Sequence, residues 1–235
     1  MVIAMLALAL AGCADPAPVG SPDPETPSPT PTPTVTEPVE EPEELPGEAI
    51  DWGPQDGAVL AVVGVAADDV LNLRDGPGVG FDVVAELAPL EDDVVATGRA
   101  RQIEGSAVWV EAAAGGATGW ANYAYLAYLG QVDDITSRLG TPAGGSELVD
   151  VADAVVRQWS GEAEEGEARR TVTVVDGPHY GDLGEITVDV LGMGDDSVLG
   201  TRLHIFASPD GGRFTARTVE ATVLCARGVT EGLCL

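Results

Sequence analysis

The sequence predicts a mainly β protein: a small β-barrel followed by an α+β domain, after a disordered proline-rich linker. Residues 14–47 hold 11 of the 17 prolines. Beyond them, short runs of Val, Ala and Leu recur about every 8–12 residues between Gly, Pro and Asp clusters, as in small barrels. Towards the end, one helical pattern precedes about four alternating segments, which indicates one main helix on an antiparallel sheet.

The charge of the chain limits its partners. Of 235 residues, 39 are Asp or Glu and 11 are basic, all of them arginine, so the net charge is −28. Such a chain is repelled by phosphate backbones and by anionic lipid surfaces, and we expect no nucleic-acid partner. The hydrophobic content of 45% is sufficient for a packed core.

The N-terminal segment is predicted to be a targeting signal. Residues 1–12 are almost entirely apolar or small, and they are too few to span a bilayer as a helix, which takes roughly 20. The sequence Leu-Ala-Gly-Cys at 10–13 resembles a bacterial lipobox. The resemblance implies a lipoprotein signal peptide (1–12), a diacylglyceryl or palmitate-type modification on Cys13, and anchoring at the extracytoplasmic face of the cell membrane. Residues 1–4 lack the usual Lys or Arg, which leaves open a start upstream of Met1, and a buried cysteine is the alternative interpretation.

Residues 13–47 are expected to form a disordered linker rich in Pro, Thr and Glu after the lipidated cysteine. Proline removes amide donors and fixes φ, so neither a helix nor a sheet can form, and the acidic residues extend the segment further. At about 3.1 Å per residue, such a spacer reaches ~100 Å. A proline-rich recognition motif is the alternative.

Residues 58–129 are predicted to form the small barrel. The expected strands are 59–65, 70–74, 83–87, 94–97, 108–111 and 119–121. If Leu71 and Leu73 point inward, Asn72 and Arg74 point outward.

Three motifs in this region resemble the bacterial SH3-like (SH3b) domain family. They are LNLRDGP at 71–77, VWV at 108–110 and GWANYAYL at 119–126. The resemblance implies a small SH3-like barrel that binds ligands and does not catalyse, in many cases with peptidoglycan or its peptides as the ligand. The lysines common in the family are missing, and residues 99–107 are more than a tight hairpin needs.

Aromatic residues of these motifs are the candidate ligand-binding residues: Trp109, Trp120, Tyr123 and Tyr125. Each tryptophan can instead bury about 150–250 Å² in a small core. We expect the tyrosines at 123, 125 and 128 to share one face of an extended segment, as a ligand shelf or as an edge of the core.

Residues 131–235 are predicted to form the α+β domain, for which we recognise no family. A short helix is expected at 132–139, and Ser146 is a good N-cap for the main helix. The apolar face of that helix comprises Leu148, Ala152, Val155, Val156 and Trp159. The expected strands are 170–176, 185–191, 197–207 with a bulge at Gly200, and 213–224 after a hairpin turn at 210–212.

Cys225 and Cys234 are expected to form a disulfide outside the cell. The closed loop is short, and the chain-entropy estimate of its stabilisation is ~2.5–3 kcal/mol. With Cys13 lipidated, no cysteine is left over. A free nucleophilic cysteine is the alternative, whereas a metal site is disfavoured because neither a histidine nor a third cysteine lies near.

We expect a binding protein without catalytic residues, metal or cofactor. Only His179 and His204 exist, both precede Cys225, and no hydrolase, metalloprotease or nucleotide-binding motif occurs. The first hypothesis is therefore a lipoprotein of the cell envelope that binds peptidoglycan or its peptides. The alternatives are a protein-interaction scaffold without wall binding and a weak hydrolase that uses acidic residues.

Overall fold

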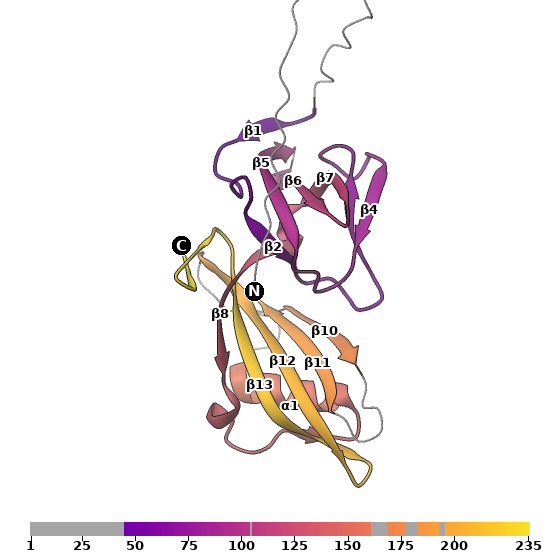
Figure 1. The fold of residues 1–235 in the computed structure, drawn as a ribbon, viewed down its shortest axis with the longest axis vertical. Helices are drawn as coiled ribbons and strands as arrows, with labels where there is room; N and C mark the ends of the chain where they lie inside the picture. The colour runs from indigo at the N-terminus through magenta and orange to yellow at the C-terminus, as the bar shows by residue number, and fades with distance from the viewer. Residues whose placement is uncertain (1–44, 104, 161–168, 177–182, 193–195) are drawn as a thin grey trace, which may run out of the picture. The chain divides into compact units, whose positions relative to one another are not determined.

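The computed structural model describes residues 45–103, 105–160, 169–176, 183–192 and 196–235 (Figure 1). These residues form a mainly β fold with one α-helix, as the sequence predicts. The predicted signal peptide, Cys13, His179 and all but the last three residues of the predicted linker lie outside them. In the described part of the chain, no helix is long and apolar enough to cross a membrane.

The N-terminal half of the fold contains seven strands, three of which are longer than the sequence predicts. The strands are β1 (Glu48–Ile50), β2 (Val59–Val62), β3 (Leu71–Arg74), β4 (Val83–Leu87), β5 (Val94–Ile103), β6 (Ala107–Ala114) and β7 (Ala117–Asn122). They pair in the order β2-β5-β6-β7-β3-β4, with β1 also on β5. The long β5–β6 hairpin accounts for residues 99–107, which exceed a tight turn.

Alternation along these strands builds one buried cluster. Leu71 and Leu73 are buried in it, together with Val110, Ala112 and Ala121 from β6 and β7. Asn72 and Arg74 are half-buried and alternate with the two leucines, which confirms the predicted pattern of β3.

Strand β8 (Leu126–Asp134) joins the two halves. Its first residues pair with β2, at Ala61–Ala127 and Val62–Leu126, and its later residues pair with β13. All the described strands except β14 and β15 therefore belong to one sheet, whose path runs open from β10 to β4, and Glu44–Leu235 is one compact unit. We expected a boundary between residues 129 and 131, and β8 runs through it.

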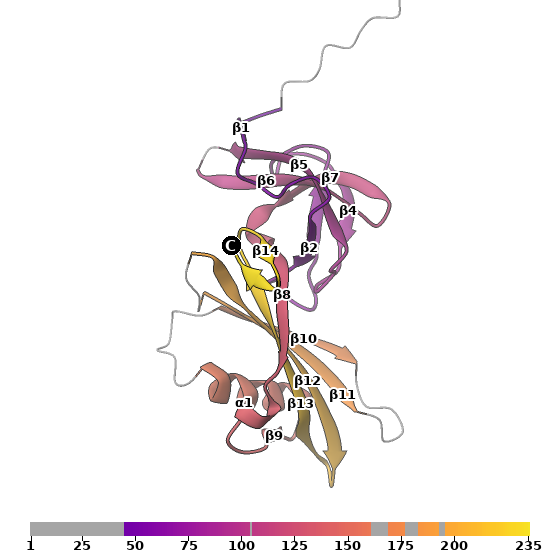
Figure 2. The same cartoon turned by 60° about the vertical axis from the view of Figure 1, so that its left-hand side comes forward.

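The C-terminal half has the predicted plan of one helix on an antiparallel sheet (Figure 2). Strands β10 (Arg169–Asp176), β11 (Gly184–Leu191), β12 (Val198–Asp210) and β13 (Arg213–Cys225) pair in chain order, and the short β9 (Gly144–Gly145) pairs with β13. The register shifts between Val198 and Gly200, so a bulge lies where Gly200 predicts one. The hairpin turn at 210–212 is also confirmed.

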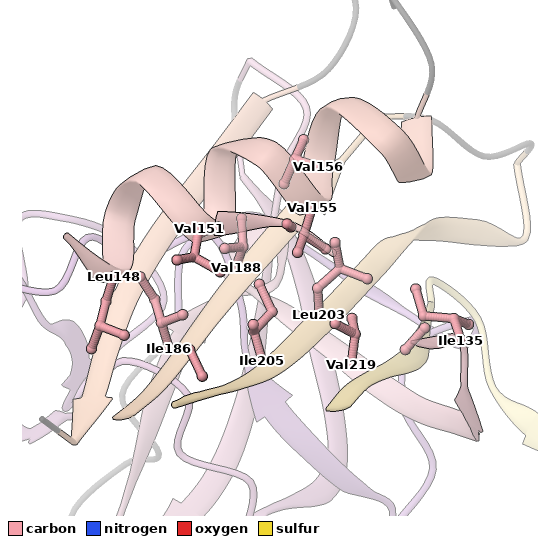
Figure 3. Packing of buried hydrophobic residues seen from close by; sticks show 14 of the residues in the cluster. Ile135, Leu148, Val151, Val155, Val156, Ile186, Val188, Leu203, Ile205 and Val219 are labelled. Carbon is pink, nitrogen blue, oxygen red and sulfur yellow. The ribbon is translucent and has the colours of Figure 1, made fainter. Parts of the chain in front are cut away.

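Helix α1 (Leu148–Ser160) packs its predicted apolar face on this sheet (Figure 3). Val151, Ala152 and Val155 are fully buried against alternate residues of the strands, among them Ile186 and Leu203. Each fully buried aliphatic side chain contributes about 1.5–3 kcal/mol. This face is what holds the helix on the sheet.

Two local predictions for this half were wrong. No α-helix forms at 132–139: β8 continues to Asp134, and only a 3₁₀ turn, η2 (Thr136–Arg138), follows. Val132 pairs with Thr222 in the sheet, and Ile135 is fully buried in the helix–sheet core. Ser146 does not cap through its own hydroxyl oxygen, because that hydroxyl donates to Asp150 Oδ2 (2.7 Å) and the helix begins at Leu148.

The C-terminal end is closed by the predicted disulfide. Cys225 and Cys234 lie at disulfide distance, with Cα atoms 5.2 Å apart. Between them, β14 (Val229–Thr230) pairs with β15 (Leu233–Cys234), and Gln131 N donates to Gly232 O (2.8 Å). The disulfide thus fixes a small hairpin beside β8.

The end of the predicted linker is part of the fold. Arg101 donates to the carbonyl oxygens of Leu45 (2.8 Å), Pro46 (2.8 Å) and Gly47 (2.6 Å). Strand β1, which follows at once, pairs with β5 at Glu48–Gln102. Residues 45–47, which the sequence assigns to the linker, therefore belong to the fold. Their carbonyl oxygens are held by a distant arginine, which supplies donors that this proline-containing segment cannot provide for itself.

Candidate functional site

A cleft of about 480 Å³ lies beside β3, on the face that carries Asn72 and Arg74. Its lining combines polar and apolar groups from four segments of the N-terminal half: Gly64, Val65, Ala66, Asp69, Val70, Leu71, Asn72, Arg74, Val79, Trp109, Asn122 and Tyr125. We call it the β3 cleft. It brings together residues of all three motifs that resemble SH3-like domains.

The turn after β3 positions Arg74. Arg74 Nη1 donates to Phe81 O (2.7 Å), and Asp75 N donates to Asp82 O (3.0 Å). The ring of Phe81 occupies the space that a side chain at Gly76 would need. Glycine at this position therefore lets the turn close, and the hydrogen bond to Phe81 O holds the guanidinium of Arg74, which lines the cleft.

Trp109 and Asn122 come from neighbouring strands. They are register partners on β6 and β7, on the side of the strands away from the buried cluster. Trp109 is only 5% exposed, so it forms part of the cleft wall.

Tyr125 reaches the cleft from a 3₁₀ turn, η1 (Tyr123–Tyr125). The turn begins at Asn122, whose Oδ1 accepts a hydrogen bond from Ala124 N (3.0 Å). Tyr125 is 38% exposed and is available to a ligand.

Tyr123 lies in this 3₁₀ turn and does not line the β3 cleft, so the prediction of tyrosines along one extended face was wrong. The alternative, an edge of the core, holds for Tyr123 and Tyr128, which pack against the buried cluster of the N-terminal half. The Tyr123 hydroxyl donates to Ala226 O (2.6 Å), and burial, with a smaller contribution from Tyr128, raises the pKa of Tyr123 well above its usual range. Tyr123 lines a second pocket, of about 450 Å³, together with Trp52, Val108 and Leu199. The Asn122 cap breaks the extended backbone that the prediction required.

Trp120 does not line the β3 cleft. It is 2% exposed, and the Arg99 guanidinium lies 5.2 Å from its ring centre. Arg99 in turn pairs with Glu111 (2.5 Å), which also accepts from Thr97 Oγ1 (2.7 Å). Trp120 is covered by this hydrogen-bonded network, whose members stabilise the β5–β7 face.

Sequence reasoning missed the other cleft walls. Residues 64–66 and Asp69 lie in the connection between β2 and β3, and Val79 lies in the turn after β3. Such connections carry no periodicity from which their position could be read. The Gly-rich and Asp-rich composition of residues 64–80 indicates loops, but it does not show that these loops meet at the β3 cleft.

The described histidine and the acidic residues form no metal site. His204 Nε2 lies 3.3 Å from Glu185 Oε2 on neighbouring strands. In the described ranges, no group of three or more His, Cys, Asp or Glu side chains is arranged to hold a metal ion.

Comparison of the chain with protein-family models, with curated proteins and with solved structures gives no match.

Proposed function

We propose that this protein is a lipid-anchored lipoprotein of the cell envelope that binds cell-wall peptides in the β3 cleft of an SH3-like barrel. The observation that carries the proposal is the convergence of Asn72, Arg74, Trp109, Asn122 and Tyr125 in one cleft. These residues belong to the three motifs on which the family resemblance rests. The proposal includes no catalytic step and no cofactor.

The cleft is suited to an extended peptide. The Asn72 and Asn122 amides can each donate to a peptide carbonyl and accept from a peptide N–H. The Trp109 and Tyr125 rings supply apolar surface beside them. A mixed apolar and amide lining of this kind is common in sites that bind small ligands.

The charged groups of the cleft give such a peptide a direction. Asp69 precedes β3 and Arg74 is its last residue, so the two are at most about 17 Å apart at about 3.3 Å per residue. An extended peptide of about four or five residues covers that length. Asp69 favours an amine at one end of the peptide, and Arg74 favours a carboxylate at the other.

Sedimentation of the full chain with purified peptidoglycan tests the proposal. We expect the parent chain to be retained and the Asn72→Ala/Tyr125→Ala variant to bind at least about tenfold more weakly, since each tenfold loss corresponds to about 1.4 kcal/mol. Gln131→Ala/Trp52→Ala is the matched control, because it removes an exposed amide and an exposed ring outside the cleft. Equal retention of both variants, or no retention of the parent chain, would exclude the cleft as a wall-binding site.

The direction of the peptide has a separate test. Asp69→Asn should weaken binding of the tetrapeptide stem of peptidoglycan when its N-terminal amine is free. It should leave binding of the same peptide with an acetylated N-terminus unchanged. If Asp69→Asn weakens both peptides equally, the predicted amine contact is absent.

A further inference from the structure

We propose that Asp189 and Arg202, in the C-terminal half, are positioning residues that hold one wall of the β3 cleft in place. The wall is the segment 62–66 of the N-terminal half. The effect on ligand binding rests on the proposed function of the cleft, whereas the effect on the wall does not.

Asp189 and Arg202 form a buried ion pair between β11 and β12. They are register partners, and the guanidinium binds the carboxylate through two hydrogen bonds, from Nε to Oδ1 (2.7 Å) and from Nη2 to Oδ2 (2.9 Å). The residues are 2% and 9% exposed. They lie on the sheet face opposite to α1, since they alternate with Val188, Val190 and Leu203 of the helix–sheet core.

The pair also binds the segment 62–66 directly. Arg202 Nη2 donates to Val62 O (2.6 Å), and Gly64 N donates to Asp189 Oδ2 (3.2 Å). These bonds connect residues 140 and 125 positions apart in the chain. Each charged group of this pair, which is removed from water, thereby gains a backbone hydrogen-bond partner.

The same segment forms the cleft wall. Gly64, Val65 and Ala66 line the β3 cleft, and Val63 N donates to the carbonyl oxygen of Tyr125, another lining residue (2.9 Å). Gly64 has φ +67°, a backbone conformation that other residues rarely adopt. The path of the wall therefore depends on a glycine turn and on two hydrogen bonds from the other half of the molecule.

Apolar packing supports this contact without replacing it. Val63 and Ala127 form a small buried cluster with Leu191 and Leu224 of the C-terminal half. Packing of this kind is not directional, whereas the ion pair fixes the carbonyl of Val62 and the amide of Gly64 at defined positions. The C-terminal half thereby determines the shape of a site to which it contributes no lining residue.

The test compares the parent chain with Asp189→Leu/Arg202→Met. The double variant replaces the buried pair by apolar side chains of similar size, a change that buried ion pairs commonly tolerate, and it removes both bonds to the wall. The control, Glu185→Gln/His204→Gln, alters another pair on the same two strands, farther from the segment 62–66. Two quantities are measured on the full chain: hydrogen exchange of the Gly64 amide, and the dissociation constant for the tetrapeptide stem of peptidoglycan.

We expect the double variant to accelerate exchange at Gly64 and to raise the dissociation constant, each at least about tenfold, with a nearly unchanged melting temperature. The control should change neither quantity. Unchanged exchange at Gly64, or unchanged affinity despite faster exchange, would overturn the positioning role.

Two further outcomes are also decisive. If the parent chain does not bind the tetrapeptide, the proposed function fails, and exchange at Gly64 still shows whether the ion pair holds the wall. If the double variant does not fold, Arg202→Lys replaces it: this variant keeps the buried charges but loses the planar fork that reaches both Asp189 and Val62 O. The same changes in exchange and affinity are expected, and their absence overturns the proposal.

Discussion

Tyr123 shows how one side chain can join distant parts of the chain. Its ring is half-buried between the 3₁₀ turn of the N-terminal half and the residue that follows Cys225. Because burial disfavours the charged phenolate, and because the hydroxyl donates to Ala226 O, the protonated form of the phenol is the one that this environment favours.

We predict that Tyr123→Phe lowers the free energy of unfolding by about 0.5–1.5 kcal/mol near pH 7, the usual contribution of one hydrogen bond. The pKa of Tyr123 is raised above its ordinary value of 10.0, so above pH 10 the unfolded chain loses this proton before the folded chain does. The contribution of the Tyr123 hydroxyl to the free energy of unfolding is therefore fully present below pH 10 and declines above it. Urea unfolding between pH 8 and 11.5 should therefore show that the free energy of unfolding falls less steeply with pH in Tyr123→Phe than in the parent chain. Parallel curves would show that Tyr123 does not contribute to this decline.

Trp109 and Trp120 show that the sequence does not determine which of two similar tryptophan rings faces the β3 cleft. Both stand in family-like motifs, and both lie on the strand side away from the buried cluster. Only their neighbours differ, since Arg99 covers Trp120 whereas Trp109 faces the β3 cleft. Arg99 lies in the bulge of β5, where the register shifts between Ala96 and Ala100, and no periodic pattern predicts which ring that bulge will cover.

At the scale of elements, β3 and β7 approach each other closely at Gly119. A Cβ atom on Gly119 would lie 2.7 Å from the carbonyl oxygen of Arg74 and 2.8 Å from Val84 Cγ2. The glycine before Trp120 therefore serves strand packing, and the cleft depends on it through Arg74.

We predict that Gly119→Ala destabilises the fold by about 1–3 kcal/mol, because the backbone of β3 cannot move aside as a flexible side chain could. Gly140→Ala is the matched control, since open space surrounds that glycine. Thermal unfolding of both variants checks the prediction. A Gly119→Ala melting temperature equal to that of Gly140→Ala would show that β3 and β7 can separate at little cost.

The start of α1 depends on a carboxylate that reaches back to the preceding residues. Asp150 Oδ2 accepts hydrogen bonds from Ser146 Oγ, Glu147 N and Ser146 N, and these bonds lower the pKa of Asp150. Because the pKa is lower in the folded chain, this stabilisation is present above pH 3.8 and is lost as the pH falls through the folded-state pKa.

Asp150→Asn should therefore flatten the acid decline of stability below pH 4, in addition to weakening the helix start at neutral pH. Glu147→Gln is the control, because it removes the same charge beside the same helix end. Circular dichroism during urea unfolding at pH 3 and pH 7 measures both effects. An acid decline of Asp150→Asn as steep as that of the parent chain would contradict the assignment.

The sequence predicts those elements that are determined by their own residues, and it misses those that are determined by a distant partner. The face of α1 and the alternation of β11 to β13 repeat over many residues, so their periods are visible in the chain. In contrast, β1 is a strand because β5 extends far enough to pair with it, and residues 132–134 are a strand because β13 lies beside them. Pairing with a distant partner decides such segments, and a single sequence does not display its partners.

At the scale of the whole molecule, the two halves share a strand as well as contacts. Strand β8 pairs with β2 at one end and with β13 at the other. The cluster around Val63 and Leu224 and the pair Asp189–Arg202 lie at the same junction. Opening either half therefore exposes apolar surface and buried charge that belong to the other.

We accordingly predict one cooperative unfolding transition for the unit Glu44–Leu235 within the full chain. Val188→Ala removes two methyl groups from the fully buried helix–sheet core and should cost about 2 kcal/mol. If the halves unfold together, hydrogen exchange through global opening should accelerate equally at Leu203 and at Val110, which lies in the other core. Val132→Ala, on an exposed position of β8, should leave both unchanged. Acceleration confined to Leu203 would show that the shared strand does not couple the two cores, and the C-terminal half could then not hold the cleft wall through its own stability.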